Sequence, residues 1–299
     1  MKPLVSIIMP SFNSGRYIHN TIKSVVSQSY NNWELIIIDN HSTDNTLDIV
    51  RSFNDDRINI LSINNKGIIA SSRNLGIKKS TGELIAFLDS DDLWYPSKIE
   101  VCLNYLSKDI WFVCHSEVWS YQNKGKEIKR RKINYGHNGK TTFEKLLFEG
   151  NCISTSAVMI EKKHLIEVGC FNISSDLITV EDYHLWLKLL RNKVSIKFIP
   201  IVLGEFLIHG NNTSNSNSKN LNALSNAFEL IYQDYENLNF KTKIKAIRRR
   251  SIIIYEGARG FQSLGEFNKS IILNFKAIFK WPFRLKFYLA LLMSIIRVR

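Results

Sequence analysis

The sequence predicts an α/β protein in which helices flank a doubly wound, mainly parallel sheet, with a helical appendage at the C-terminal end. Short apolar runs alternate with amphipathic segments over the first half of the chain, as in parallel sheets whose strands are joined by helices. Polar residues follow several of these apolar runs directly. From Leu221 onwards the pattern is helical. We therefore expect two domains, 1–218 and 219–299.

The expected strands are short apolar runs that end at polar or turn-forming residues. They are 5–9, 33–38, 58–63, 84–88, 111–119, 156–160 and one or two strands within 194–206. The expected helices repeat apolar residues every three or four positions. They are 17–28, 44–53, 67–79, 98–106, 143–148, one beginning near 180, 221–238, 244–264, 267–280 and one within 281–299. We expect the polar, basic stretch 121–140 to be a mobile loop.

The run Leu84–Leu88 predicts a buried central strand, and it stops at Asp89-Ser90-Asp91-Asp92. Carboxylates two residues apart on an extended chain face the same way, and they repel each other unless a cation gathers them. Their hard oxygens suit Mg²⁺ or Mn²⁺, ions that usually share a substrate's phosphates. One interpretation is a metal–diphosphate site. The other is an acidic turn before the next helix.

Further polar residues follow other strands of the predicted sheet. Pro10–Asn13 and Asp39 end the first two strands, and ligands of doubly wound sheets bind at the carboxyl ends of strands. The Gly-x-Gly-x-x-Gly and Walker A patterns are absent from the sequence, which disfavours a glycine loop around the phosphates.

Glu181 and Asp182 open a predicted buried helix. Acids in a first turn interact favourably with the helix dipole, which is the structural explanation. The functional explanation makes one carboxylate a general base, kept ionised by the same dipole. His209 precedes the polar tract 210–216; it is either a solvated loop residue or the start of a metal-binding lid.

The charge is concentrated at the C-terminal end. The net charge is +13, of which residues 241–299 carry +12. This predicts an anionic partner for the tail, whereas the nearly neutral body is not expected to bind nucleic acid. Phe287–Ile296 is too short to span a bilayer, so the segment 281–299 is expected either to lie in a membrane interface or to pack on protein. The cysteine spacing and the N-terminal segment predict a reduced, cytoplasmic protein.

Together these stretches resemble the family-two, inverting glycosyltransferases, which have a GT-A fold. The resemblance runs from about Leu4 to His209. It rests on VSIIMPSFNSGRYI, ELIIIDNHSTDNT, NKGIIASSRNLGIKKSTGELIAFLDSDDLW and VGCFNISSDLITVEDYHLWLKLL. It implies that Asp182 is the catalytic base, with Glu181 beside it. The implied nucleotide-sugar residues are Pro10, Phe12, Asp39, Asn65, Arg73 and Asp89, and the implied metal-site residues are Asp91, Asp89 and His209.

The resemblance implies metal-dependent transfer of a hexosyl or N-acetylhexosaminyl group, with Mn²⁺ or Mg²⁺ as cofactor. The expected donor is a nucleotide-diphosphate sugar, with uridine as the family's usual base, and the expected acceptor is a glycan or polyprenyl-linked glycan. Two other functions stay open at this point, a nucleotide-sugar-binding protein without turnover and a sugar nucleotidyltransferase. The implied setting is surface polysaccharide synthesis, such as that of lipopolysaccharide or capsule, at the cytoplasmic face of the inner membrane. A homo-oligomer is also compatible with the sequence.

Overall fold

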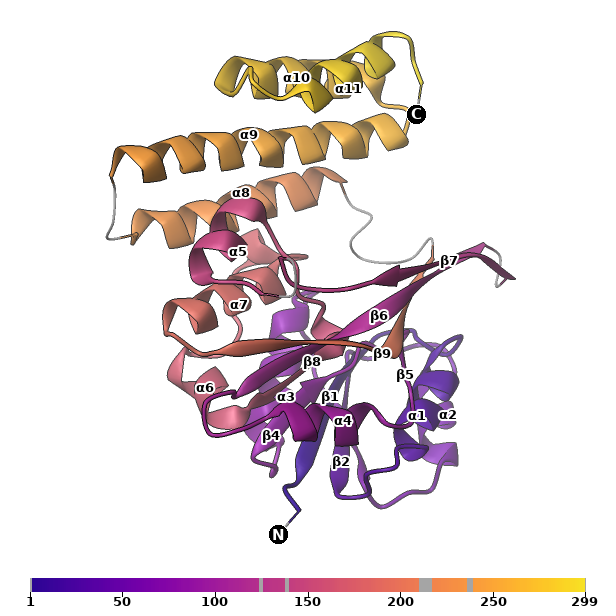
Figure 1. Cartoon of the computed structure of the whole chain (residues 1–299). Coiled ribbons are helices and arrows are strands. Elements are labelled where there is room, and N and C mark those ends of the chain that lie inside the picture. The colour runs from indigo at the N-terminus through magenta and orange to yellow at the C-terminus, as the bar shows by residue number, and fades with distance from the viewer. Residues whose placement is uncertain (1, 124–125, 138–139, 210–216, 236–238, 299) are drawn as a thin grey trace. The chain divides into compact units, whose positions relative to one another are not determined.

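The computed structural model describes residues 2–298 except 124–125, 138–139, 210–216 and 236–238. The chain divides into two compact units (Figure 1). The first comprises 1–143, 152–173 and 185–210, and the second comprises 144–151, 174–184 and 211–299. The second unit thus contains the predicted appendage together with two short segments of the predicted first domain.

The strands of the first unit form one sheet in the order β3-β2-β1-β4-β8-β6-β9-β5, with β7 paired to β6. The described strands are β1 Val5–Ser11, β2 Trp33–Asp39, β3 Ile58–Ser62, β4 Leu84–Phe87, β5 Leu93–Trp94, β6 Phe112–Asn123, β7 Lys126–Ile133, β8 Val158–Glu161 and β9 Ile196–Ile208. Strands β3, β2, β1 and β4 are parallel, and β8 enters antiparallel between β4 and β6. The predicted alternation of strands and helices is confirmed in this parallel part.

Helices cover both faces of the sheet, which explains why β1 and β4 are buried along their whole length. One face packs on α1 and α4, and the other on α3 and on Trp186 of α7. Gly76 of α3 allows this close packing, because an added Cβ would lie 2.6 Å from a methyl carbon of Ile8. The bounds are α1 Ile18–Val26, α2 Thr46–Ser52, α3 Ile69–Lys79, α4 Lys98–Tyr105, α6 Lys162–Glu167 and α7 Glu181–Arg191.

The stretch 121–140, expected to be a loop, was predicted wrongly. Its described residues include β7, which pairs antiparallel with β6 from Glu117↔Ile133 to Asn123↔Lys126. The hairpin is stabilised by one contact to β9 and one within itself. Arg130 forms a salt bridge with Glu205 of β9, and Ser120 Oγ donates to Glu127 at 2.9 Å. The many lysines and arginines of this segment fit an edge strand, where charged side chains remain in water.

The second unit is helical, as predicted for residues beyond 219 (Figure 1). Its helices are α5 Phe143–Glu149, α8 Asn217–Gln233, α9 Phe240–Ser263, α10 Phe267–Lys280 and α11 Leu285–Ile295. Phe148 of α5 packs edge-on against Phe228 and Tyr232 of α8. Among the described residues, no helix combines the length and apolar character needed to cross a membrane.

Candidate active site

The carboxyl ends of β1, β2 and β4 form one rim of the sheet, which we call the strand-end rim. Ser11 pairs with Asp39 across β1 and β2, and Ile8 pairs with Phe87 across β1 and β4. The residues that follow Phe87 therefore lie beside those that follow Ile8. The topology thus brings Pro10, Asp39 and Asp89 to the same rim.

Asp39 is 2 % exposed, and its carboxylate accepts hydrogen bonds from the backbone N–H of Ser42 at 2.9 Å and from Ser42 Oγ at 2.5 Å. A carboxylate has capacity for further donors. Phe12 is 57 % exposed just beyond β1. Asn65 is anchored to the loop after β2, because its backbone N–H donates to Asn40 Oδ1 at 2.9 Å. These residues offer an acidic acceptor and an aromatic ring on adjoining loops.

Asp89 is paired with a cation from the neighbouring helix. Arg73 is 3 % exposed on α3, and its Nη2 lies 2.8 Å from Asp89 Oδ1. The backbone N–H of Asp89 donates to Ser156 Oγ at 3.1 Å, which holds the turn in place. Arg73 thereby compensates one negative charge of the cluster.

Asp91 has a different partner. His209, directly after β9, places Nε2 2.9 Å from Asp91 Oδ2. The His209 ring stacks on Tyr17, with centroids 4.5 Å apart and planes inclined by 15°. The structure thus joins two residues that are distant in sequence and both predicted for the metal site. Tyr17 was not predicted as a site residue, since nothing in its local sequence separates it from a core aromatic.

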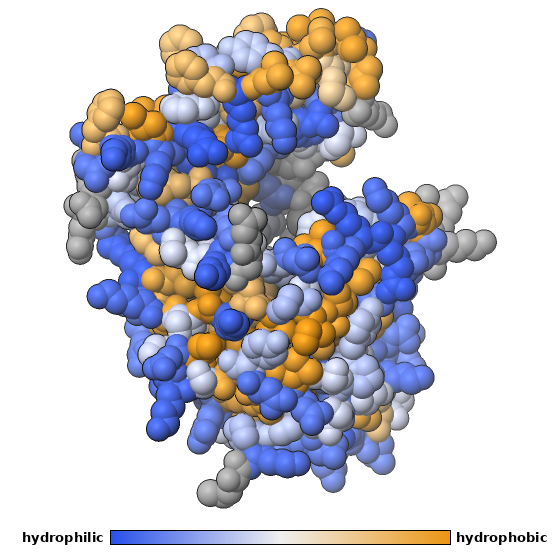
Figure 2. Space-filling model, viewed as in Figure 1, coloured by the Kyte–Doolittle hydropathy of each residue, from blue (hydrophilic) through white to orange (hydrophobic). Residues whose placement is uncertain are grey.

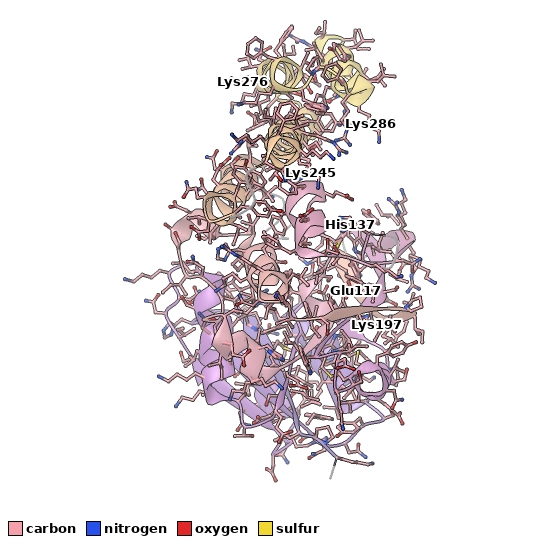
Figure 3. All side chains as sticks on the ribbon, turned by 60° about the vertical axis from the view of Figure 1, so that its left-hand side comes forward. Glu117, His137, Lys197, Lys245, Lys276 and Lys286 are labelled. Carbon is pink, nitrogen blue, oxygen red and sulfur yellow. The ribbon has the colours of Figure 1, made fainter. Side chains whose placement is uncertain are left out.

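Two further acids are buried behind this pair. Asp92 is 1 % exposed and accepts from Ser156 Oγ at 2.5 Å and from the N–H of Leu207 at 3.0 Å. Burial raises its pKa well above the usual range, and the nearby Asp91 adds to the effect. Glu117 on β6 lies inside the sheet unit (Figure 3), where burial raises its pKa to about 7. Asp92 ties the end of β9 to the turn after β4, a role that the sequence did not indicate.

Glu181 and Asp182 form the first turn of α7, as predicted. Asp182 Oδ1 accepts from the backbone N–H of Tyr183 at 2.6 Å, and Tyr183 Oη donates to the carbonyl oxygen of Leu146 at 2.9 Å. Glu181 is buried. Both acids belong to the second unit, whereas the strand-end rim belongs to the first.

The side-chain oxygen and nitrogen atoms at the strand-end rim suit a divalent cation that takes its other ligands from a substrate. Within the described ranges, no cluster of three or more His, Cys, Asp and Glu side chains forms a ready-made metal site. The Asp91–His209 pair supplies one carboxylate and one imidazole. Mg²⁺ and Mn²⁺ commonly take their remaining ligands from phosphate oxygens and water. The polar tract 210–216, considered above as a lid, lies outside the described residues.

A surface hollow of about 740 Å³ lies at the opposite edge of the sheet, lined by Pro3, Glu83 and Leu106 among others. Pro3 and Glu83 precede β1 and β4, so the hollow is at the amino ends of these strands. Since ligands of doubly wound sheets bind at the carboxyl ends, we assign the site to the strand-end rim.

Comparison with known proteins identifies the family of the chain. Residues 6–169 match the family model described as glycosyl transferase family 2. The chain is 33 % identical over 222 residues to the UDP-Glc:alpha-D-GlcNAc-diphosphoundecaprenol beta-1,3-glucosyltransferase WfgD of Escherichia coli, covering 73 % of this chain and 82 % of WfgD. It is 29 % identical to TuaG of Bacillus subtilis, a putative teichuronic acid biosynthesis glycosyltransferase, over 80 % of this chain and 91 % of TuaG.

Solved structures with low sequence identity share the fold. S. aureus TarS 1–349 in complex with UDP superposes with a TM-score of 0.65 at 17 % identity, covering 98 % of this chain and 88 % of that one. The mannosyltransferase PcManGT of Pyrobaculum calidifontis, in complex with GDP-Man and Mn²⁺, superposes with a TM-score of 0.63 at 14 % identity, covering 99 % of this chain and 87 % of that one. The chain belongs to glycosyl transferase family 2. The predictions of the family, the GT-A fold and glycosyltransferase function are thereby confirmed.

Proposed function

We propose that this glycosyltransferase moves a hexosyl or N-acetylhexosaminyl group from a UDP-sugar to a hydroxyl of a polyprenyl-diphosphate-linked glycan, with inversion at the anomeric carbon. The observation that carries the proposal is the acidic turn after β4, where Asp89 faces Arg73 and Asp91 faces His209. The names of WfgD and TarS support a UDP-linked donor, and that of WfgD a lipid-linked acceptor.

The nucleotide would bind at the strand-end rim. Asp39 would accept a hydrogen bond from the base, with Pro10, Phe12 and Asn65 around it. Arg73 and Asp89 would orient the diphosphate and the sugar. Asp91 and His209 would hold Mn²⁺ or Mg²⁺, with Asp89 close by. The ion, when bound, offsets negative charge on the leaving diphosphate. The presence of Mn²⁺ in the PcManGT complex supports this choice of ion.

Asp182 would act as the general base. It would take the proton of the acceptor hydroxyl as that oxygen forms a bond to the anomeric carbon. The bond from the anomeric carbon to the diphosphate oxygen breaks on the opposite face, and the nucleoside diphosphate leaves with the electron pair. The position of Asp182 in the first turn of α7 supports an ionised carboxylate, because the helix dipole favours negative charge there. Glu181 would stand beside the base as the second acid of that turn.

Replacement of the base tests this proposal. Asp182→Asn keeps the shape of the side chain and should lower turnover by roughly 10²–10⁴, with donor binding unchanged. UDP release and glycosylated lipid would be measured with GlcNAc-diphosphoundecaprenol and a panel of UDP-sugars, and product NMR would report inversion. The matched control is Asp176→Asn, an exposed carboxylate six residues earlier. Near-normal turnover of the Asp182 variant would contradict the assignment, and pyrophosphate release would indicate nucleotidyl transfer.

A lipid-linked acceptor would put the reaction at a membrane. We propose surface polysaccharide synthesis, such as that of lipopolysaccharide or capsule, as the setting; the name of TuaG, a putative teichuronic acid biosynthesis glycosyltransferase, supports surface polysaccharide synthesis in general. We propose a peripheral enzyme on the cytoplasmic face of the inner membrane.

A further inference from the structure

The last two helices expose apolar side chains along one face. On α10 these are Ile272, Phe275 and Phe279, which are 55 %, 56 % and 91 % exposed. On α11 every strongly exposed residue except Lys286 is apolar. They are Leu285, Tyr288, Leu289, Leu292 and Ile295, continued by Ile296. We call these nine residues the apolar face. Figure 2 shows apolar side chains gathered over α10 and α11.

The apolar face follows the geometry of the helices. Ile272, Phe275 and Phe279 are spaced by three and four positions, so they lie on one side of α10. The buried residues Ser270, Asn274 and Ala277 have the same spacing and lie on the opposite side. A stripe that follows the helical period marks a continuous surface, whereas single exposed apolar residues scattered over a protein need no explanation.

The interior between these helices holds polar groups beside apolar ones such as Ala277 and Phe287. Ser270 Oγ of α10 and Ser294 Oγ of α11 are hydrogen-bonded at 2.9 Å, and both side chains are fully buried. Asn274, also fully buried, donates to the carbonyl oxygen of Ser270 at 3.0 Å. A helix pair in water normally buries its apolar side and exposes its polar side. Large apolar side chains that stay outside while Ser270, Asn274 and Ser294 are buried favour an apolar medium for the outer face.

The charges beside the apolar face have one sign. Residues 267–299 contain seven lysines and arginines and no acidic residue. Lys269, Lys276 and Lys280 are exposed and spaced by seven and four, so they form a stripe along the edge of the apolar face of α10. Lys276 and Lys286 point away from the helices that carry them (Figure 3). A partner for this surface therefore has to be apolar in its interior and negatively charged where the lysines meet it.

We infer that the apolar face of α10 and α11 docks into an anionic lipid surface, with both helices lying in the plane of the interface. At about 1.5 Å per residue, the 11 residues of α11 reach roughly 16 Å, half the thickness of the hydrocarbon layer. An apolar face bordered by lysines is the arrangement that binds such interfaces. A second copy of the chain fits less well, because pairing would bring two basic surfaces together. This inference does not depend on the proposed substrates.

Flotation with vesicles tests the inference on the full chain without donor or acceptor. The chain should float with phosphatidylglycerol vesicles at low salt, bind less to phosphatidylcholine vesicles and dissociate partly at high salt, because the Debye length falls to about 3 Å at 1 M. A triple variant, Phe275→Ser, Phe279→Ser and Leu292→Ser, should lower the partition coefficient roughly tenfold or more. The pair Lys276→Gln and Lys280→Gln should lower it roughly fivefold per lysine on phosphatidylglycerol only.

Matched controls come from the first unit. Ile128 and Ile166 are 66 % and 57 % exposed, and Ile128→Ser with Ile166→Ser should leave flotation unchanged. Lys129→Gln with Lys132→Gln controls for basic charge, since both lysines are exposed on β7. Thermal unfolding of each variant verifies that it folds. Equal flotation of the triple variant and the unaltered chain would overturn the inference. The inference would also be overturned if no form of the chain bound vesicles and sedimentation showed a dimer that the triple variant does not form.

Discussion

Asp89 and Asp91 stand two residues apart at the end of β4, yet they face different partners. Arg73 compensates Asp89, and His209 contacts Asp91. Two carboxylates this close would repel each other in a dry site. This division of partners favours Asp91 over Asp89 as the carboxylate that would hold a cation together with the His209 imidazole.

Metal dependence can be tested at this pair. Chelation should abolish transfer, and Mn²⁺ or Mg²⁺ should restore it. His209→Ala should raise the Mn²⁺ concentration for half-maximal binding about tenfold or more, as measured by the paramagnetic resonance of Mn²⁺ in the presence of UDP. His19→Ala is the control, because His19 is an exposed histidine on α1. Full activity in excess chelator would refute a metal on Asp91.

Glu117 predicts a pH dependence of stability. Burial raises its pKa from 4.5 to about 7, so between these values the folded chain keeps a proton that the unfolded chain releases. The free energy of unfolding therefore falls as pH rises through this window, by at most about 1.4 kcal/mol per pH unit. Asp92, whose pKa is also raised, acts in the same direction.

Urea unfolding measures this fall in the free energy of unfolding. The pH would be varied from about 5 to about 7.5, which covers most of the window. Glu117→Gln keeps an acceptor for Tyr135 Oη, which donates to Glu117 Oε2 at 2.6 Å. The variant should gain stability relative to the unaltered chain as pH rises. Glu83→Gln, at an exposed acid, should show no such trend. A pH-independent difference between the Glu117 variant and the unaltered chain would show that the carboxyl does not titrate there.

At the scale of the elements, one lysine of α7, Lys188, connects this helix to the turn at 168–170. Lys188 Nζ donates to the carbonyl oxygens of Val168 at 2.6 Å and Cys170 at 2.8 Å. Cys170 has a φ of 52°, so this turn is strained for a side-chain-bearing residue. Lys188→Met removes both hydrogen bonds and should cost roughly 1–3 kcal/mol of unfolding free energy, measured in urea. Lys197→Met, at an exposed lysine of β9, is the control; an equal effect of both would contradict the role of Lys188.

The elements also show what the sequence could predict and what it could not. The parallel strands and the acids at their ends follow from local patterns, because apolar runs and strand-end polar residues lie within a few positions of each other. The β7 hairpin does not, because β7 is a basic edge strand without an apolar run, and its Arg130 meets Glu205, 75 residues away. The Tyr17–His209 stack and the hydrogen bond from Leu207 to Asp92 also join residues that are far apart in the sequence. Such contacts have no period or motif in the sequence.

At the scale of the whole molecule, the helical unit is assembled from three separated segments. Phe148 of α5 contacts the rings of Phe228, Tyr232 and Tyr235. Thr179, just before α7, is hydrogen-bonded to Asn220 of α8. The segments 144–151 and 174–184 thus have their packing partners beyond residue 218, where the sequence suggested a domain boundary. Since 174–184 holds Asp182, the appendage supports the proposed catalytic base.

A chain that ends at residue 218 should therefore fail as an independent catalytic domain. It would expose Phe148 to water and leave the Asp182 turn without α8. We expect no cooperative thermal transition, or one far below that of the full chain. A milder form of the same change is Phe228→Ala, at a fully buried ring, which should cost roughly 3–5 kcal/mol and reduce transfer as the turn loosens. Leu230→Ala, at an exposed leucine of the same helix, should have little effect. A truncated chain that unfolds cooperatively and transfers sugar at the full rate would show that residues 1–218 suffice, and that the helices after them serve only to bind another surface.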